Sequence, residues 1–192
     1  MANSTEQKVI TAARECFFQH GYKASNMTLI SEYAGFSRAT VHKYTKNKED
    51  AFRKVCQQFQ EQAETACQPI MKENMECWSA INLIMQAWLK PSFDEVRDIK
   101  ILNDLKYHAQ VIAEDVFTSA RKQMENMLCE QLEKGISKDE INLHPLSQTP
   151  RQFAQLLLAS LTGLRGQFDK THIHRASLDT LNIFKRACRA QN

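Results

Sequence analysis

The chain has 192 residues, of which 43% are hydrophobic and 24% charged, and its formal net charge is +3. Five glycines and four prolines leave too few turn residues for an all-β protein, and six scattered cysteines without a C-x-x-C pair exclude a small disulfide framework. No apolar run approaches the roughly 18 residues of a membrane helix, and the first residues lack the pattern of a signal peptide. We therefore expect a reduced cytoplasmic protein without membrane segments.

The charge is distributed unevenly along the chain. Residues 1–54 contain nine Lys or Arg and five Asp or Glu, whereas residues 55–192 contain sixteen and seventeen. A short basic segment before a nearly neutral long one indicates a polyanion-binding module joined to a module with another task. The expected domains are 1–54 and 55–192.

The first predicted helix follows Ser4 and ends at Gly21. Apolar residues recur at helical spacing between Val9 and Phe17. Ser4 and Gln7 form a capping box before this stripe, and Gly21 suits a left-handed residue behind it.

Three further helices are predicted in the N-terminal third. Asn26 can cap a short second helix that ends near Gly35. Ser37 can cap a third helix that runs to about Tyr44. The fourth occupies 47–69, with acidic residues in its first turn and a proline at its end.

The rest of the chain also has helical periodicity. We predict helices at about 70–89, 94–105, 108–134, 150–169 and 175–189. Pro91 separates the first two, Gly135 is a C-cap, and Thr149-Pro150 opens the helix at 150. The expected fold is all-α, with about nine helices.

The most informative segment is 21–44. Ile30 and Val41 lie on the inner faces of two short helices that a glycine-containing turn joins, which predicts a helix-turn-helix. The outward side chains of the second helix are donors suited to phosphates and to base edges in a major groove: Ser37, Arg38, Thr40, His42 and Lys43. A plain helical hairpin with a solvated basic face is the alternative.

One sequence pattern favours the helix-turn-helix over the plain helical hairpin. Phe17-x-x-x-Gly21-Tyr22 is followed by Ile30-Ser31-x-x-Ala34-Gly35-Phe36-Ser37-x-x-Thr40-x-x-x-Tyr44-x-x-Asn47-Lys48-x-x-x-Phe52. This pattern resembles the N-terminal signature of the TetR family of bacterial transcription regulators, which are mostly repressors. The resemblance covers residues 5–54, and it implies an N-terminal three-helix DNA-binding domain with a larger helical domain for ligand binding and dimerisation.

The resemblance also implies roles for individual residues. Asn26 and Thr28 correspond to DNA-backbone contacts, and Lys48 corresponds to a phosphate contact at a helix N-terminus. The recognition helix is expected to meet bases and phosphates through Arg38, Ala39, Thr40, Lys43 and Tyr44. His42 replaces a frequent Tyr of the family, Ala39 a frequent Gly, and Thr45 an apolar aromatic residue, so the operator sequence is not readable from these residues.

A symmetric DNA site requires two helix-turn-helix units, so we expect a homodimer on a pseudo-palindromic, double-stranded operator. The predicted interface lies on the helix at 150–169, with the helix at 108–134 as its partner. Its residues form an apolar stripe with small residues beside it: Phe153, Leu156, Leu157, Ser160, Leu161, Gly163, Leu164 and Gly166. The alternative is that this stripe is intramolecular core.

Large adaptable side chains between 70 and 125 are typical of a small-molecule cavity and also of any helical core. The family keeps its ligand cavity in this region, which implies a small hydrophobic or amphipathic effector. The candidate lining residues are Trp78, Met85, Trp88, Phe93, Tyr107, His108, Ile112, Phe117 and Met124.

The expected function is a ligand-responsive DNA-binding regulator, a repressor in preference to an activator. A C-terminal domain that binds a protein partner instead of a metabolite is the alternative. Weaker hypotheses are a metal site at His172-x-His174 with Asp169 and an oxidation sensor at Cys16. The chain has no G-x-S-x-G, H-E-x-x-H, P-loop or G-x-G-x-x-G motif, so we expect no enzyme activity, cofactor or metal.

Overall fold

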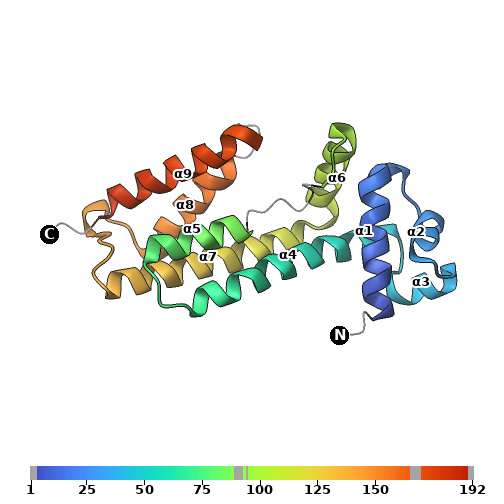
Figure 1. Ribbon diagram of the computed structural model, residues 1–192, viewed down its shortest axis with the longest axis horizontal. Coiled ribbons are helices and arrows are strands. Elements are labelled where there is room, and N and C mark those ends of the chain that lie inside the picture. The colour runs from blue at the N-terminus through green and yellow to red at the C-terminus, as the bar shows by residue number, and fades with distance from the viewer. Residues whose placement is uncertain (1–3, 89–92, 94, 165–169, 190–192) are drawn as a thin grey trace. The chain divides into compact units, whose positions relative to one another are not determined.

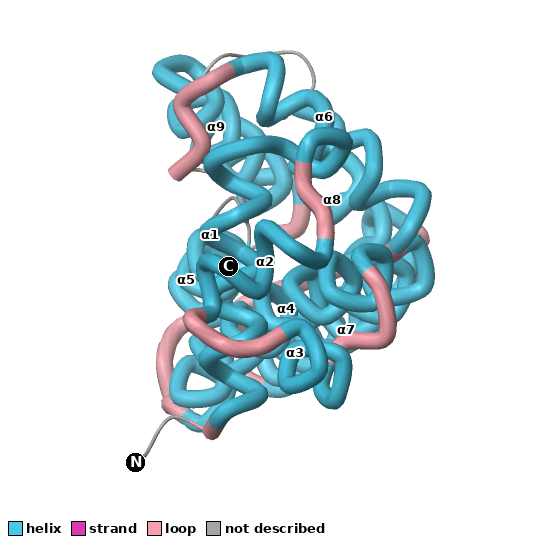
Figure 2. The backbone as a smooth tube through the Cα atoms, turned by 90° about the vertical axis from the view of Figure 1, so that its right-hand side faces the viewer, coloured by secondary structure: helices cyan, strands magenta, loops and turns pink. Residues whose placement is uncertain are grey.

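The computed structural model describes residues 4–88, 93, 95–164 and 170–189 (Figure 1). The helices are α1 (Thr5–Ala24), α2 (Met27–Ala34), α3 (Arg38–Tyr44), α4 (Lys48–Lys72), α5 (Cys77–Trp88), α6 (Ile99–Ile112), α7 (Glu114–Ser137), the 3-10 helix η1 (His144–Leu146), α8 (Pro150–Leu164) and α9 (Lys170–Ala187). Figure 2 shows helices joined by loops, and these ranges contain no strand beyond one isolated bridge between Ile141 and Arg189. The all-α prediction is confirmed.

The N-terminal helices begin where their capping residues predict. Ser4 Oγ accepts a hydrogen bond from the Gln7 N–H at 3.2 Å, which caps α1. Asn26 Oδ1 accepts from the Leu29 N–H at 3.0 Å, which caps α2. Each bond satisfies a backbone donor that the first helical turn leaves without a partner, so local chemistry determines these boundaries.

Two predicted helix ends differ from the structure in different ways. α1 is interrupted at Gly21, whose positive φ of 79° is the expected one, and a short helical continuation runs to Ala24. α4 continues through Pro69 to Lys72. Because Pro69 lies near the end of α4, its missing N–H removes one bond there and does not stop the helix.

Gly135 is not the C-cap that we predicted. It lies inside α7, which continues to Ser137. A Cβ at this position would lie 2.8 Å from Cys77 Cβ and 2.9 Å from Cys77 Sγ. The glycine therefore lets α5 approach α7 closely, and this packing outweighs its low helix propensity.

α6 and α7 are shifted from their predicted ranges of 94–105 and 108–134, whereas α8 begins at Pro150 as predicted. α6 begins at Ile99, where Asp98 Oδ1 accepts from the Lys100 N–H at 2.7 Å. The predicted break between 105 and 108 occurs instead at Ala113, which has non-helical dihedral angles. Residue 94 and the end of the predicted helix at 150–169 lie outside the described residues.

The chain forms two compact units. Unit 1 comprises residues 1–64 and 90–120, and its buried core includes Phe17, Tyr22 and Phe52. Unit 2 comprises residues 65–89 and 121–192, with a separate core from α4, α5, α7, α8 and α9. α4 and α7 contribute residues to both units. The predicted functional boundary after residue 54 stays a prediction, since unit 1 also contains α6.

Candidate DNA-binding surface

α2 and α3 form a two-helix unit that packs on α1 (Figure 1). Ile30 of α2 and Val41 of α3 are fully buried in the core of unit 1. Gly35, with φ 64°, ends α2 in the left-handed conformation, and the Phe36 N–H donates to Ser31 O at 3.3 Å. Local turn chemistry and two buried apolar residues thus fix the angle of α3.

α3 presents a basic face to solvent. Ser37 Oγ accepts from the Thr40 N–H at 3.1 Å and caps the helix. Arg38, Ala39, His42 and Lys43 are exposed, and the seven residues of α3 contain no carboxylate. The inner side of this helix is buried, and its outer side has exposed Arg, His and Lys donors. Such side chains are suited to base edges in a major groove.

A concave surface lies beside the start of α3. Its volume is about 660 Å³, and its lining residues come from the ends of four helices: Ser25, Asn26, Met27, Thr28, Leu29, Glu32, Arg38 and Lys48. It brings together four predicted DNA-binding residues, namely Asn26, Thr28, Arg38 and Lys48. The N-terminus of α2 and two cations face one hollow, which favours a bound anion, although the Glu32 carboxylate opposes it.

Some predicted contact residues have structural partners. Tyr44 is half-buried, and its carbonyl O accepts from Lys54 Nζ at 2.6 Å. His42 Nδ1 lies 3.2 Å from Lys46 O. Thr45 is fully buried, and its hydroxyl donates to Val41 O at 3.2 Å, which explains how a polar residue occupies an apolar position.

Lys48 has a partner that the sequence did not indicate. Its Nζ donates to Tyr22 O at 3.1 Å and lies 4.2 Å from the centroid of the Tyr22 ring. The two residues are 26 positions apart, so no local pattern predicts this pair. The ammonium group is held by a carbonyl dipole and a cation–π contact at the edge of the concave surface.

Comparison with known proteins finds a family model that matches this part of the chain. Residues 9–55 fit the family model described as "Bacterial regulatory proteins, tetR family". Residues 9–55 are therefore similar to the N-terminal DNA-binding domain of TetR-family regulators. A curated relative, the "Uncharacterized HTH-type transcriptional regulator YhgD" of Bacillus subtilis (strain 168), is 21% identical over 141 residues, which are 73% of this chain and 74% of YhgD.

Solved structures with low sequence identity share the fold of this chain. A transcriptional regulator from Cytophaga hutchinsonii ATCC 33406 has a TM-score of 0.75 at 17% identity, covering 94% of this chain and 96% of its own. SmeT, a Stenotrophomonas maltophilia repressor solved with triclosan, has a TM-score of 0.69 at 15% identity, covering 96% and 91%. These structures support the all-α arrangement over nearly the whole length.

The predicted effector-binding residues divide between the two units. Trp78, Met85 and Met124 are buried in the core of unit 2, which Trp88 joins at its edge. Phe93, Ile112 and Phe117 pack in or against the core of unit 1. His108 contacts Tyr22, and Tyr107 is 61% exposed. Their role in ligand binding stays a prediction.

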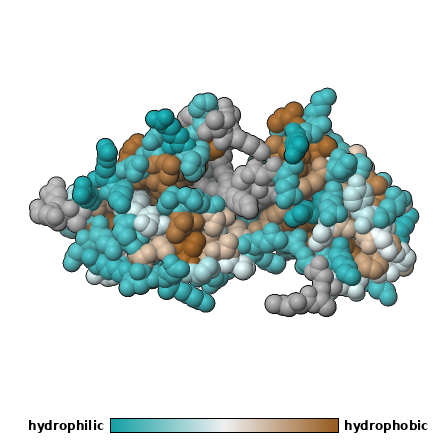
Figure 3. Space-filling view, viewed as in Figure 1, coloured by the Kyte–Doolittle hydropathy of each residue, from teal (hydrophilic) through white to brown (hydrophobic). Residues whose placement is uncertain are grey.

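The exposed face of α6 is mixed. Figure 3 shows hydrophobic as well as hydrophilic surface over this helix, where Ile99, Tyr107 and Val111 are the large exposed apolar residues. Tyr107 therefore lies at the surface, among exposed polar residues of the same helix: Lys100, Asn103, Lys106 and Gln110. The second described pocket, of about 290 Å³, has a different lining, with Met71, Cys77 and Gln131 among its residues.

α8 separates the predicted dimer residues into two faces. Phe153, Leu157 and Leu161 are buried in the core of unit 2, which agrees with the alternative that this stripe is intramolecular core. Leu156, Ser160 and Gly163 are exposed, and Leu164 is half-buried. Gly166 lies outside the described residues. The predicted interface therefore depends on the exposed face.

The thiols are protected by burial. All six cysteines are buried, and burial raises the pKa of Cys56 and Cys77 to about 12. Burial also raises the pKa of Cys16, the proposed oxidation sensor. A protonated thiol is a poor nucleophile, which disfavours that hypothesis. Within the described ranges no three His, Cys, Asp or Glu side chains gather as metal ligands, and Asp169 lies outside them.

No helix in the described ranges has the length and apolar character to span a membrane.

Proposed function

We propose that this protein is a TetR-family repressor that binds a pseudo-palindromic operator as a homodimer and leaves it when a small effector binds. The exposed basic face of α3 carries this proposal. Arg38 and Lys43 extend from a helix whose inner side is buried, and no acidic residue interrupts them. Sequence-specific recognition needs side chains at base edges, and a bidentate Arg is the commonest of these contacts.

The DNA backbone is the second part of the site. Asn26, Thr28 and Lys48 line the concave surface next to Arg38. We assign phosphate contacts to Thr28 and Lys48, because both lie near a helix N-terminus where the helix dipole favours an anion. Phosphate contacts orient the protein and carry no sequence information, so base selection belongs to α3.

Dimer formation is assigned to the outer face of α8, with α9 beside it. Leu156 on α8 is exposed, as are Leu178 and Ile183 on α9, so this part of unit 2 has apolar side chains in water. Ser160 and Gly163 are small and exposed, which permits close approach of a second helix. A two-fold related copy would cover these residues and place two α3 helices on one operator.

The effector is assigned to the C-terminal part of the chain as a small hydrophobic or amphipathic molecule. SmeT, which shares the fold, is named as a repressor and was solved with triclosan, a ligand of this class. An effector that favours the DNA-free arrangement by a coupling of about 1–3 kcal/mol changes operator affinity by roughly 5–150-fold.

The test compares two cationic residues of the same surface. After selection of the preferred site from random double-stranded DNA, Arg38→Ala should relax preference at one base pair, where it costs about 1–3 kcal/mol. Lys48→Ala should weaken binding to all DNA sequences alike, and it should reduce the slope of log affinity against log salt concentration by about one. Equal, sequence-independent losses in both variants would refute base reading by Arg38, and no selected site at all would refute the function.

A further inference from the structure

The segment 21–23, in the last turn of α1, is fixed to α6 by one carboxylate. Asp104 Oδ2 accepts a hydrogen bond from the Lys23 N–H at 3.0 Å. A Cβ at Gly21 would lie 2.9 Å from the same oxygen and would displace this carboxylate, and the φ of 79° independently favours glycine. Asp104 and this segment therefore fit each other closely, although 81 positions separate Asp104 from Lys23.

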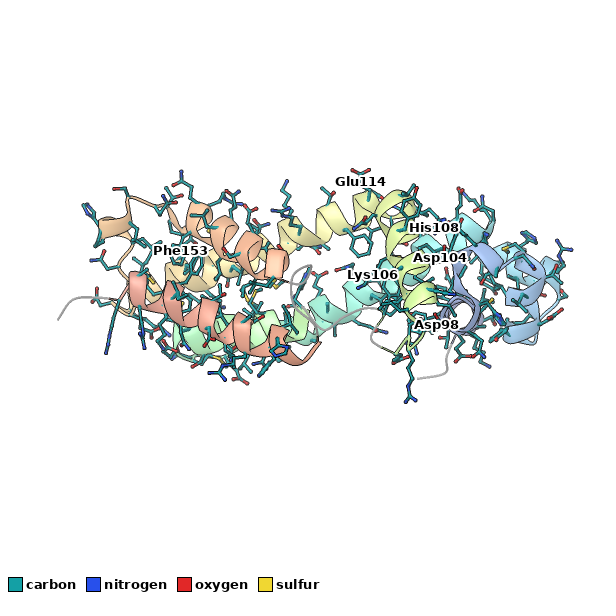
Figure 4. The ribbon with its side chains drawn as sticks, turned by 90° about the horizontal axis from the view of Figure 1, so that it is seen from above. Asp98, Asp104, Lys106, His108, Glu114 and Phe153 are labelled. Atoms are coloured by element: carbon teal, nitrogen blue, oxygen red, sulfur yellow. The ribbon has the colours of Figure 1, made fainter. Side chains whose placement is uncertain are left out.

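His108 lies one turn after Asp104 on α6 (Figure 4). It contacts Tyr22, the residue between Gly21 and Lys23. Its ring stacks on Tyr22 with centroids 4.2 Å apart and an interplanar angle of 26°. Its Nδ1 lies 2.8 Å from Asp104 O and 3.2 Å from Asp104 Oδ1. The side chains of His108 and Asp104 are only 14% and 16% exposed, so α6 holds Tyr22 from a mostly buried position.

Tyr22 in turn holds Lys48. The same residue that stacks on His108 accepts the hydrogen bond from Lys48 Nζ through its carbonyl O and faces the ammonium with its ring. Burial, together with the negative charges of Glu49 and Asp104, raises the pKa of Tyr22. A continuous set of contacts thus runs from Asp104 and His108 through Tyr22 to the lysine of the concave surface.

We propose that Asp104 and His108 are positioning residues for DNA binding, which hold Tyr22 and so keep the Lys48 ammonium in place for a DNA phosphate. A lysine side chain has many rotamers. If one rotamer is already fixed before binding, less side-chain conformational entropy is lost when the complex with DNA forms. Of the three ammonium donors, the bond to Tyr22 uses one, so donors remain for a phosphate. The inference rests on the proposed DNA-binding function.

The test is a double-mutant cycle on the selected operator. Each phosphate contact contributes about 0.9 to the slope of log affinity against log salt, or about eightfold for a tenfold change in salt. Asp104→Ala should weaken binding by about fivefold and lower the salt slope toward the value of Lys48→Ala. In the Lys48→Ala background, Asp104→Ala should change affinity by less than about twofold, because the contact that it supports is already absent.

Two matched variants complete the design. Asp104→Asn keeps an oxygen that accepts from the Lys23 N–H, so it should restore affinity to within about twofold of the wild type. Lys43, an exposed lysine of α3, is the control: in the Lys43→Ala background, Asp104→Ala should keep its full effect. An equal loss in the Lys43→Ala and Lys48→Ala backgrounds would overturn the inference, as would an unchanged salt slope. Failure of the wild-type protein to bind DNA would overturn the proposed function instead.

Discussion

Two neighbouring leucines of α8 give a direct test of the dimer surface. Leu157 is fully buried in the core of unit 2, whereas Leu156 is 51% exposed. Leu157→Ala removes methyl groups from a packed core, so it should lower the free energy of unfolding by about 2–5 kcal/mol. Leu156→Ala should cost an isolated chain about 1 kcal/mol or less, since half of the side chain already contacts water.

A charge at the exposed position separates dimerisation from folding. If α8 packs against its symmetry mate, Leu156→Glu places an unpaired carboxylate from each copy in an apolar interface, at a cost of several kcal/mol. A cost of about 4 kcal/mol corresponds to roughly a thousandfold rise in the dimer dissociation constant. Sedimentation velocity over a range of concentrations measures this constant, and circular dichroism verifies that the variant is folded.

Leu83→Glu on α5 is the matched control. Leu83 is 40% exposed in the same unit and lies outside the predicted interface, so the variant should dimerise as the wild type does. A folded Leu156→Glu variant that dimerises as well as Leu83→Glu would refute the assignment of the interface to this face of α8.

Two further predictions concern the interior. Gly135→Ala should lower the melting temperature, because the new Cβ would meet Cys77 at 2.8 Å and overpacking costs about 1–3 kcal/mol; a rise, the usual result of Gly to Ala inside a helix, would contradict this close contact. The pKa of Cys56 and Cys77 is raised by burial to about 12, and that of Cys188 to about 11, from 9.0. The folded state thus favours the protonated thiols, so this contribution to stability is complete below pH 9 and is lost as the pH rises toward 12. Labelling with a thiol reagent at pH 8 should be slow in the folded protein and fast after unfolding, and rapid labelling of the native protein would contradict the burial.

The parts of the fold that the sequence predicts depend on interactions between near neighbours. Ser4, Asn26 and Ser37 cap helices through bonds to residues three positions ahead. Gly21 and Gly35 have the positive φ values that their places in the pattern require. Such signals lie within one helical turn, so they can be read without knowledge of the tertiary structure.

The parts that were missed depend on contacts between distant positions. Nothing near Gly135 in the sequence reveals the approach of Cys77. Leu156 and Leu157 are equally apolar, and adjacent helical residues differ by about 100° in direction, so only packing decides which of them is buried. The pattern of α8 contains a buried face and an exposed face, and the sequence alone does not distinguish intramolecular core from a partner surface.

Gly21 and Tyr22 belong to a local sequence pattern and also make contacts with distant parts of the chain. Both belong to the pattern that resembles the TetR signature. By itself, this pattern predicts only that the two residues form a turn at the end of α1. Both residues lie in α1 and neither belongs to α3. The Tyr22 ring lies between Phe52 of α4 and His108 of α6, with centroid distances of 5.1 and 4.2 Å. Part of a DNA-binding signature therefore fixes the packing of α1, α4 and α6, and in our proposal it acts on DNA binding through Lys48, which Tyr22 holds.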